Sequence, residues 1–128
     1  MRYLMDTHVL LWAAYQKAQL SSRARRILVA SGNDVFVSAA SAWEISTKVR
    51  LGKLPAAQVL ADDFISIVTG AGYILLPIST EHALRAGSMT GEHRDPFDRM
   101  LAAQALLESL PLLSADPQLD TFGVRRVW

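Results

Sequence analysis

The sequence contains no cysteine, so neither a disulfide framework nor a thiolate metal site is possible. This absence fits a reducing compartment, and we expect a cytoplasmic protein. No apolar run approaches the roughly 20 residues that a membrane-spanning helix needs, so we expect no membrane association. No stretch matches GxxxxGK[ST], which disfavours nucleotide binding through a P-loop. The histidines, His8, His82 and His93, lack the close pairing that is typical of zinc sites.

An excess of charge of one sign is absent as well. Thirteen basic residues nearly balance twelve acidic ones, and the formal net charge is +1. Proteins that bind nucleic acid through bulk electrostatics are usually far more basic, so any such binding must be local. Apolar residues, in contrast, make up 51% of the 128 residues, enough to bury the core of one folded domain. We expect a single domain over residues 1–128.

Short apolar runs alternate along the chain with longer helical patterns. The runs predict strands at residues 2–6, 34–38, 73–78, 111–114 and 124–128. The helical patterns cover residues 9–16, 21–31, 41–51, 56–72, 80–87 and 96–109. Continuous apolar strands are buried on both faces, which is typical of a parallel sheet between helix layers. The predicted fold is a three-layer α/β/α domain with a mostly parallel sheet of about five strands.

Acidic residues follow these strands or open the next helix, and four of them stand out: Asp6, Glu44, Asp98 and Asp116. The carboxyl ends of parallel strands meet at one edge of a sheet, so we expect these side chains to gather there. Carboxylates that lie close together repel, which raises the pKa of at least one of them. A hard divalent cation such as Mg²⁺ or Mn²⁺ removes this repulsion. Such an ion also supports phosphodiester cleavage.

Each acid also has a purely structural interpretation. Three acids stand where a helix N-cap is expected, two of them directly before proline: Asp6, Asp95 and Asp116. Ser41 and Glu44 fit a capping box, and Glu44 also precedes Lys48 at the spacing of a helical ion pair. Capping explains why acids occur near helix starts. It does not explain why four of them should gather at one edge of the sheet.

Four segments resemble, in order and over nearly the whole chain, the PIN-domain ribonucleases: MDTHVLLW, SAASAWEISTKVRLGKLP, HRDPFDRMLAAQA and LLSADPQLDTF. The similarity is greatest to the VapC-type toxins of type II toxin–antitoxin systems. This resemblance implies a Mg²⁺- or Mn²⁺-dependent endoribonuclease with an RNA substrate. It further implies a homodimer and a cognate VapB-like antitoxin that blocks the site.

The resemblance also assigns roles by motif position. It implies a catalytic set of Asp6, Glu44, Asp98 and Asp116. Asp6 and Asp98 would bind the metal directly, while Glu44 and Asp116 would act through water or at a second metal. Supporting roles fall to the hydroxyls of Thr7 and Ser114, and to Asp95 as a helix cap in preference to a fifth carboxylate.

Several neighbouring residues are candidates for the rim of the site, where RNA would pass: His93, Arg94 and Arg99. Arg99 directly follows Asp98 and points about 100° away on a helix, so we expect a salt bridge or a phosphate contact. We expect the three tryptophans to belong to the core or to an interface, and not to stack on bases: Trp12, Trp43 and Trp128.

Three alternatives compete with a toxin. A phosphoacceptor receiver domain needs an adjacent acidic pair after the first strand and a lysine near the last, but Thr7 follows Asp6 and residues 124–128 contain no lysine. A PIN-fold binding module without turnover stays open, because the presence of ligands does not establish cleavage. A housekeeping RNA-processing nuclease would use the same carboxylates, and these residues do not specify an RNA target.

Overall fold

A computed structural model describes residues 1–91 and 95–128. Over this range the strands are β1 (Arg2–Met5), β2 (Asp34–Ser38), β3 (Ile74–Leu76), β4 (Leu112–Leu113) and β5 (Arg126–Val127). The α-helices are α1 (Thr7–Tyr15), α2 (Ser22–Val29), α3 (Ala39–Arg50), α4 (Gln58–Asp62), α5 (Phe64–Gly70), α6 (Thr80–Ser88) and α7 (Pro96–Leu107). Short 3₁₀ helices are η1 (Lys17–Gln19), η2 (Pro55–Ala57) and η3 (Pro117–Phe122). None of the helices in these ranges is long and apolar enough to cross a bilayer.

The strands form one sheet in the order β3-β2-β1-β4-β5, and every pairing is parallel. The central strand β1 pairs with β2 through Met5 and Val37, and with β4 through Met5 and Leu113. The C-terminal ends of these three strands therefore lie side by side. The predicted parallel α/β sheet is confirmed, and the edge that should carry the acids is the edge where β1, β2 and β4 end.

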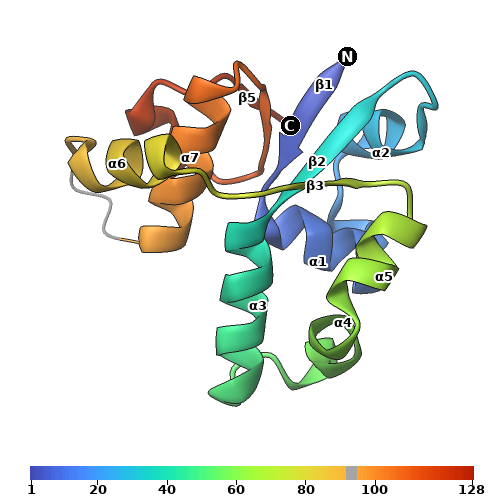
Figure 1. Ribbon diagram of the computed structural model, residues 1–128. Helices are drawn as coiled ribbons and strands as arrows, with labels where there is room; N and C mark the ends of the chain where they lie inside the picture. Colours follow the sequence, from blue (N-terminus) through green and yellow to red (C-terminus); the bar gives the residue numbers. More distant parts are fainter. Residues whose placement is uncertain (92–94) are drawn as a thin grey trace.

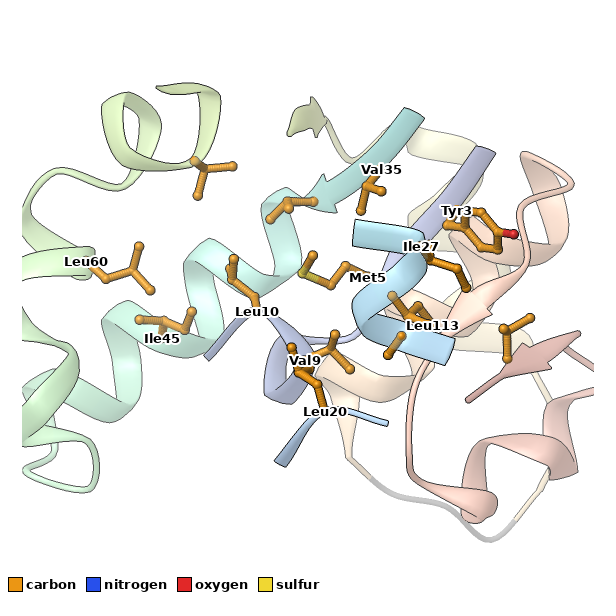
Figure 2. Packing of buried hydrophobic residues seen from close by; sticks show 14 of the residues in the cluster. Tyr3, Met5, Val9, Leu10, Leu20, Ile27, Val35, Ile45, Leu60 and Leu113 are labelled. Carbon is orange, nitrogen blue, oxygen red and sulfur yellow. The ribbon is translucent and has the colours of Figure 1, made fainter. Parts of the chain in front are cut away.

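The two faces of the sheet are covered by different helices. Tyr3 and Met5 of β1 pack into a buried cluster with residues of α1, α2 and α3, as Figure 2 shows for Met5 beside Leu10 and Ile27. Leu4, between them in sequence, belongs instead to the cluster with Leu101 of α7. Successive strand residues point to opposite faces, so both faces need apolar partners. In Figure 1, α6 and α7 lie on one side of the strands and α1 and α2 on the other, which gives the three predicted layers.

Two sequence-based expectations on helix bounds were wrong in detail, and one on Trp43 is narrowed. The single helix predicted over residues 56–72 is divided into η2, α4 and α5, because Asp63 lies at φ −134° and ψ 41°, outside the helical region. Aspartate is a poor residue for a helix interior and favours the position just before a helix. The helix predicted from Ser41 starts at Ala39, with Ser38 as its N-cap. Trp43 was expected in the core or at an interface, and because it is 58% exposed, only the interface alternative stays open.

A buried amide connects the strand ends to α7. Gln104 of α7 is fully buried and accepts a hydrogen bond from the Ser38 hydroxyl at the end of β2. Its Nε2 donates to the Pro77 carbonyl, just beyond β3, at 3.2 Å. Because buried polar groups are costly to leave unpaired, these contacts fix α7 against the sheet. The helix that carries Asp98 is therefore held at the edge where the strands end.

Candidate metal centre

Asp6 directly follows β1 and is 3% exposed. It occupies the N-cap position of α1, but its side chain makes no capping hydrogen bond. The Ser114 hydroxyl donates to Asp6 Oδ2 at 2.7 Å. Asp6 Oδ1 has no partner, and among the described residues it is the buried side-chain atom in that state. A buried carboxylate oxygen without a donor is a place for a cation.

The surroundings of Asp6 disfavour its charged form. Burial raises the pKa of the Asp6 carboxyl, and the hydrogen bond from Ser114 offsets part of that effect. The nearby charge of Glu44 raises the pKa further, while His8 lowers it. The sequence predicted a raised pKa from repulsion between carboxylates, whereas burial is the larger cause. A bound cation would reverse this shift, because it favours the charged carboxylate.

Glu44 lies inside α3 and is almost fully buried. Ser38 caps this helix and Glu44 comes six residues later, so the capping-box interpretation is wrong. The Glu44 carboxylate instead accepts a short hydrogen bond from the Lys48 ammonium one turn on, which confirms the alternative of a helical ion pair.

Lys48 is a cation placed among the acids. Burial lowers the pKa of Lys48, but the hydrogen bond and charge of Glu44, with the charges of Asp95 and Asp98, outweigh it and raise the pKa overall. Both Asp95 and Asp98 therefore lie close enough to act on this ammonium. Lys48 therefore places a positively charged side chain of the protein itself beside the acids at this edge of the sheet.

Asp95 positions the first turn of α7. Its Oδ1 accepts from the backbone N–H groups of Phe97 at 2.9 Å and Asp98 at 3.2 Å, so its predicted role as a cap is confirmed. Asp98 is in this turn and is partly exposed. The Phe97 ring packs edge-on against Trp43 of α3, with 4.9 Å between ring centroids. The turn that carries Asp98 is thus held against the helix that carries Glu44.

Asp116 is joined to Asp6 through Ser114. The Asp116 N–H donates to Ser114 Oγ at 3.1 Å, and the same hydroxyl donates to Asp6. The Asp116 carboxylate also caps η3, accepting from the Gln118 N–H at 3.0 Å. Both acids line one cavity of about 370 Å³, together with His8, Trp12, Ala115 and Pro117. Capping and membership of an acidic site are therefore compatible for Asp116.

The four predicted acids are linked as neighbours and do not form one compact cluster. Over residues 1–91 and 95–128, no group of three or more Asp, Glu or His side chains is arranged to hold a metal ion. Asp6 instead neighbours Glu44 electrostatically and Asp116 through Ser114, while Lys48 stands among Glu44, Asp95 and Asp98. Mg²⁺ and Mn²⁺ need only one or two carboxylates and otherwise retain water. The unpaired Asp6 oxygen and an all-oxygen set of donors fit such an ion.

Thr7 and Arg99 have further contacts among the described residues. The Thr7 hydroxyl pairs with the Ser41 hydroxyl at 2.8 Å and not with a carboxylate. Arg99 donates to the carbonyls of Ala86 and Met89 near the end of α6, which ties α6 to α7. The rim candidates His93 and Arg94 lie outside the described residues.

Sequence reasoning underrated two residues. Lys48 was considered only as a partner for Glu44, yet it faces three acids. His8 lines the cavity with Asp6 and acts on its charge. The signals were the four-residue spacing from Glu44 and the two-residue spacing from Asp6, and both spacings are common enough to carry little information on their own.

Comparison with known proteins gives a consistent family and fold. The PIN domain family model matches residues 3–124. No curated protein sequence matches significantly. The structure of VapBC2 from Rickettsia felis, bound to a DNA fragment from its promoter, aligns with a TM-score of 0.72 and 18% identity, covering 99% of this chain and 98% of that one.

Two further solved structures are similar over almost their whole length. FitAcB from Neisseria gonorrhoeae aligns with a TM-score of 0.65 and 21% identity, covering 100% of this chain and 97% of that one. VapBC-1 from nontypeable Haemophilus influenzae aligns with a TM-score of 0.68 and 14% identity, covering 99% and 97%. At these identities the similarity establishes the shared fold.

Asp6→Asn is expected to stabilise the metal-free protein. Because the pKa of Asp6 is raised, the folded chain holds this proton more tightly than the unfolded chain, and stability falls as pH rises from the ordinary carboxyl range through the raised pKa. The substitution should raise the melting temperature in EDTA at pH 7 by about 2–5 °C. The gain should shrink toward pH 4, as measured by calorimetry at both pH values.

The matched control for this substitution is Asp34→Asn, which removes an exposed charge at the start of β2. It should change the melting temperature little at either pH. Added Mg²⁺ or Mn²⁺ should stabilise the wild type and the Asp34 variant, but not the Asp6 variant. If the Asp6 variant melts below the wild type at pH 7 in EDTA, the charge of the wild-type Asp6 does not destabilise the fold.

Lys48→Met should have the opposite effect, because it leaves the buried Glu44 carboxylate without its cation. We expect a loss of about 1–3 kcal/mol in the free energy of unfolding in EDTA. Divalent ions should then stabilise this variant more than the wild type, since a metal would replace the missing positive charge. Urea unfolding with and without Mn²⁺ measures both effects, with Lys17→Met as an exposed control. Equal responses of wild type and variant to Mn²⁺ would contradict a link between Lys48 and the ion.

Proposed function

This chain belongs to the PIN domain family, and from that membership and the geometry of its carboxylates we propose that it is a metal-dependent endoribonuclease. PIN domains are in general nucleases, which supports hydrolysis of nucleic acid. The observation that carries the proposal is the unpaired, buried Oδ1 of Asp6 at the edge where β1, β2 and β4 end. A structural carboxylate would be expected to use both oxygens in hydrogen bonds.

The residues that would hold the ion are Asp6 and Asp98, with Glu44 and Asp116 acting through water or at a second ion. When bound, Mg²⁺ or Mn²⁺ lowers the pKa of a coordinated water and neutralises charge on the phosphate. Ser114 fixes the Asp6 carboxylate by donating to its other oxygen. Asp95 fixes the turn of α7 and so orients Asp98.

We further propose that the enzyme is the toxin of a type II toxin–antitoxin pair. Its motifs resemble VapC-type toxins over nearly the whole chain, and its fold matches structures of VapBC2 and VapBC-1. The expected partner is a VapB-like antitoxin that blocks the acidic site, and the expected assembly includes a homodimer. RNA is the substrate class, because the resembling family consists of ribonucleases.

Asp98→Asn is expected to abolish RNA cleavage while the fold persists. The substitution removes one carboxylate charge but preserves the shape of the side chain, so losses of about 100-fold or more would reflect the site and not unfolding. Cleavage of total bacterial RNA, followed on denaturing gels with circular dichroism as the fold check, measures this effect. EDTA should stop wild-type cleavage and Mn²⁺ should restore it. Full activity of Asp98→Asn, or undiminished activity in EDTA, would reject the proposed site.

Expression in a bacterial host tests the biological role separately. The wild-type chain should arrest growth, the Asp98→Asn variant should not, and coexpression of the small protein encoded beside it should restore growth. Because the antitoxin is expected to cover the acidic edge, the two proteins should also purify as one complex. Normal growth with abundant, active nuclease would favour the housekeeping enzyme over the toxin.

A further inference from the structure

The turn of α3 beside the acids presents an exposed aromatic side chain. Trp43 is 58% exposed, although tryptophan is usually largely buried. It directly precedes Glu44, and its ring partner Phe97 directly precedes Asp98. The two rings meet at 76°, so the contact uses one edge of the pair and leaves more than half of the Trp43 side chain to solvent. An aromatic surface thus adjoins two of the proposed catalytic carboxylates.

The chain beyond Trp43 is basic. Between Glu44 and Asp62 the sequence contains no acid, but it contains Lys48, Arg50 and Lys53. Arg50 and Lys53 are exposed, and neither forms an ion pair with any residue in the described ranges. The charged side chains therefore change from acidic at Glu44 to basic along the rest of α3 and the turn after it.

Trp43 and Arg50 lie on the same face of α3. Positions seven apart are two turns apart and point the same way. At about 1.5 Å per residue they are separated by roughly 10 Å along the axis, the span of one to two nucleotides of an extended strand. Between them on this face are Ser46, which is exposed, and Thr47, which is partly exposed. In Figure 1, α3 starts at the end of β2 and runs away from the sheet, so this face leads outward from the acids.

We propose that this exposed face of α3, with the turn that follows it, binds single-stranded RNA and guides it to the carboxylates, with an unpaired base stacked on Trp43 and the backbone phosphates against Arg50 of α3 and Lys53 of the turn. The proposal rests on the proposed ribonuclease function. Unpaired bases stack on aromatic side chains with little sequence preference, and cations beside them hold the backbone. The carboxylates repel a phosphate chain, so binding energy must come from neighbouring groups such as these.

The charge pattern favours RNA over a protein partner on this face. Protein interfaces are enriched in aromatic residues and arginine but depleted in lysine and serine, and this face combines Trp43 and Arg50 with the hydroxyls of Ser46 and Thr47 and with Lys53 just beyond it. One exposed aliphatic residue, Leu51, lies at the C-cap of α3, while others that would suit a protein partner, such as Val59 and Ile65, belong to α4 and α5. Trp43 was expected in the core or at an interface; its exposure excludes the core, and a protein interface is an outcome that the test can detect.

The test measures binding of a fluorescein-labelled, eight-nucleotide oligoadenylate by anisotropy in EDTA, where the proposed cleavage is stopped. Trp43→Ala should weaken binding about tenfold, and Trp43→Phe should retain most of it. Arg50→Gln should weaken binding and flatten the dependence of log K on log salt by about 0.7 for the lost phosphate contact. A duplex of the same length should bind without dependence on Trp43, because its bases are already stacked.

Matched controls are Ile65→Ala, an exposed apolar residue of α5, and Arg23→Gln, an exposed arginine of α2. Both should bind oligoadenylate like the wild type. Unchanged affinity of Trp43→Ala, while the wild type still cleaves RNA, would overturn the α3 site and leave the ribonuclease intact. A wild type that neither binds nor cleaves any RNA would reject both. A Trp43→Ala variant that changes only oligomeric state or antitoxin binding would assign this face to a protein interface.

Discussion

The proposed site is organised around one carboxylate that is buried at the end of the central strand. Asp6 is 3% exposed, and one of its oxygens has no protein partner. The hydrophobic strand β1 continues directly into this acid, so folding of the sheet buries the Asp6 carboxyl at the edge where the strand ends. The fold tolerates this arrangement because Ser114 donates to the other oxygen and because parallel strands keep the neighbouring acids on the same edge. Such local costs are typical of functional sites.

Helix capping and the acidic site use the same residues. Asp95 and Asp116 each accept a backbone hydrogen bond at the start of a helix. The bonds to Asp95 also position Asp98, and the Asp116 side chain also lines the cavity beside Asp6. Lys48 balances part of the negative charge from within α3. The acids therefore do not form one cluster. The Ser114 hydroxyl connects Asp6 with Asp116, and the Lys48 ammonium lies among Glu44, Asp95 and Asp98. This arrangement suits an ion that takes few protein ligands and keeps much of its water.

Much of the fold could be predicted because strand burial leaves a direct trace in the sequence. Strands covered on both faces must be apolar throughout, and the runs around Leu4 and Val37 follow that rule. The break at Asp63 was missed because helical periodicity continues across it. Ser38 was missed as a cap because its position is also fixed by a hydrogen bond that its hydroxyl donates to Gln104, which lies 66 residues further along the chain. The effect of the Asp95 and Asp98 charges on Lys48, like the exposure of Trp43, depends on how helices pack, which residue spacing does not encode.

We expect this edge of the sheet to hold a divalent cation through Asp6. A crystal structure of the protein soaked in Mn²⁺, with anomalous scattering at the manganese edge, would locate such an ion. A peak is expected about 2.0–2.2 Å from Asp6 Oδ1, with Asp98 as the second protein ligand and water completing the shell. No anomalous peak at this edge, or an ion held elsewhere while Asp6 Oδ1 gains a protein donor, would contradict it.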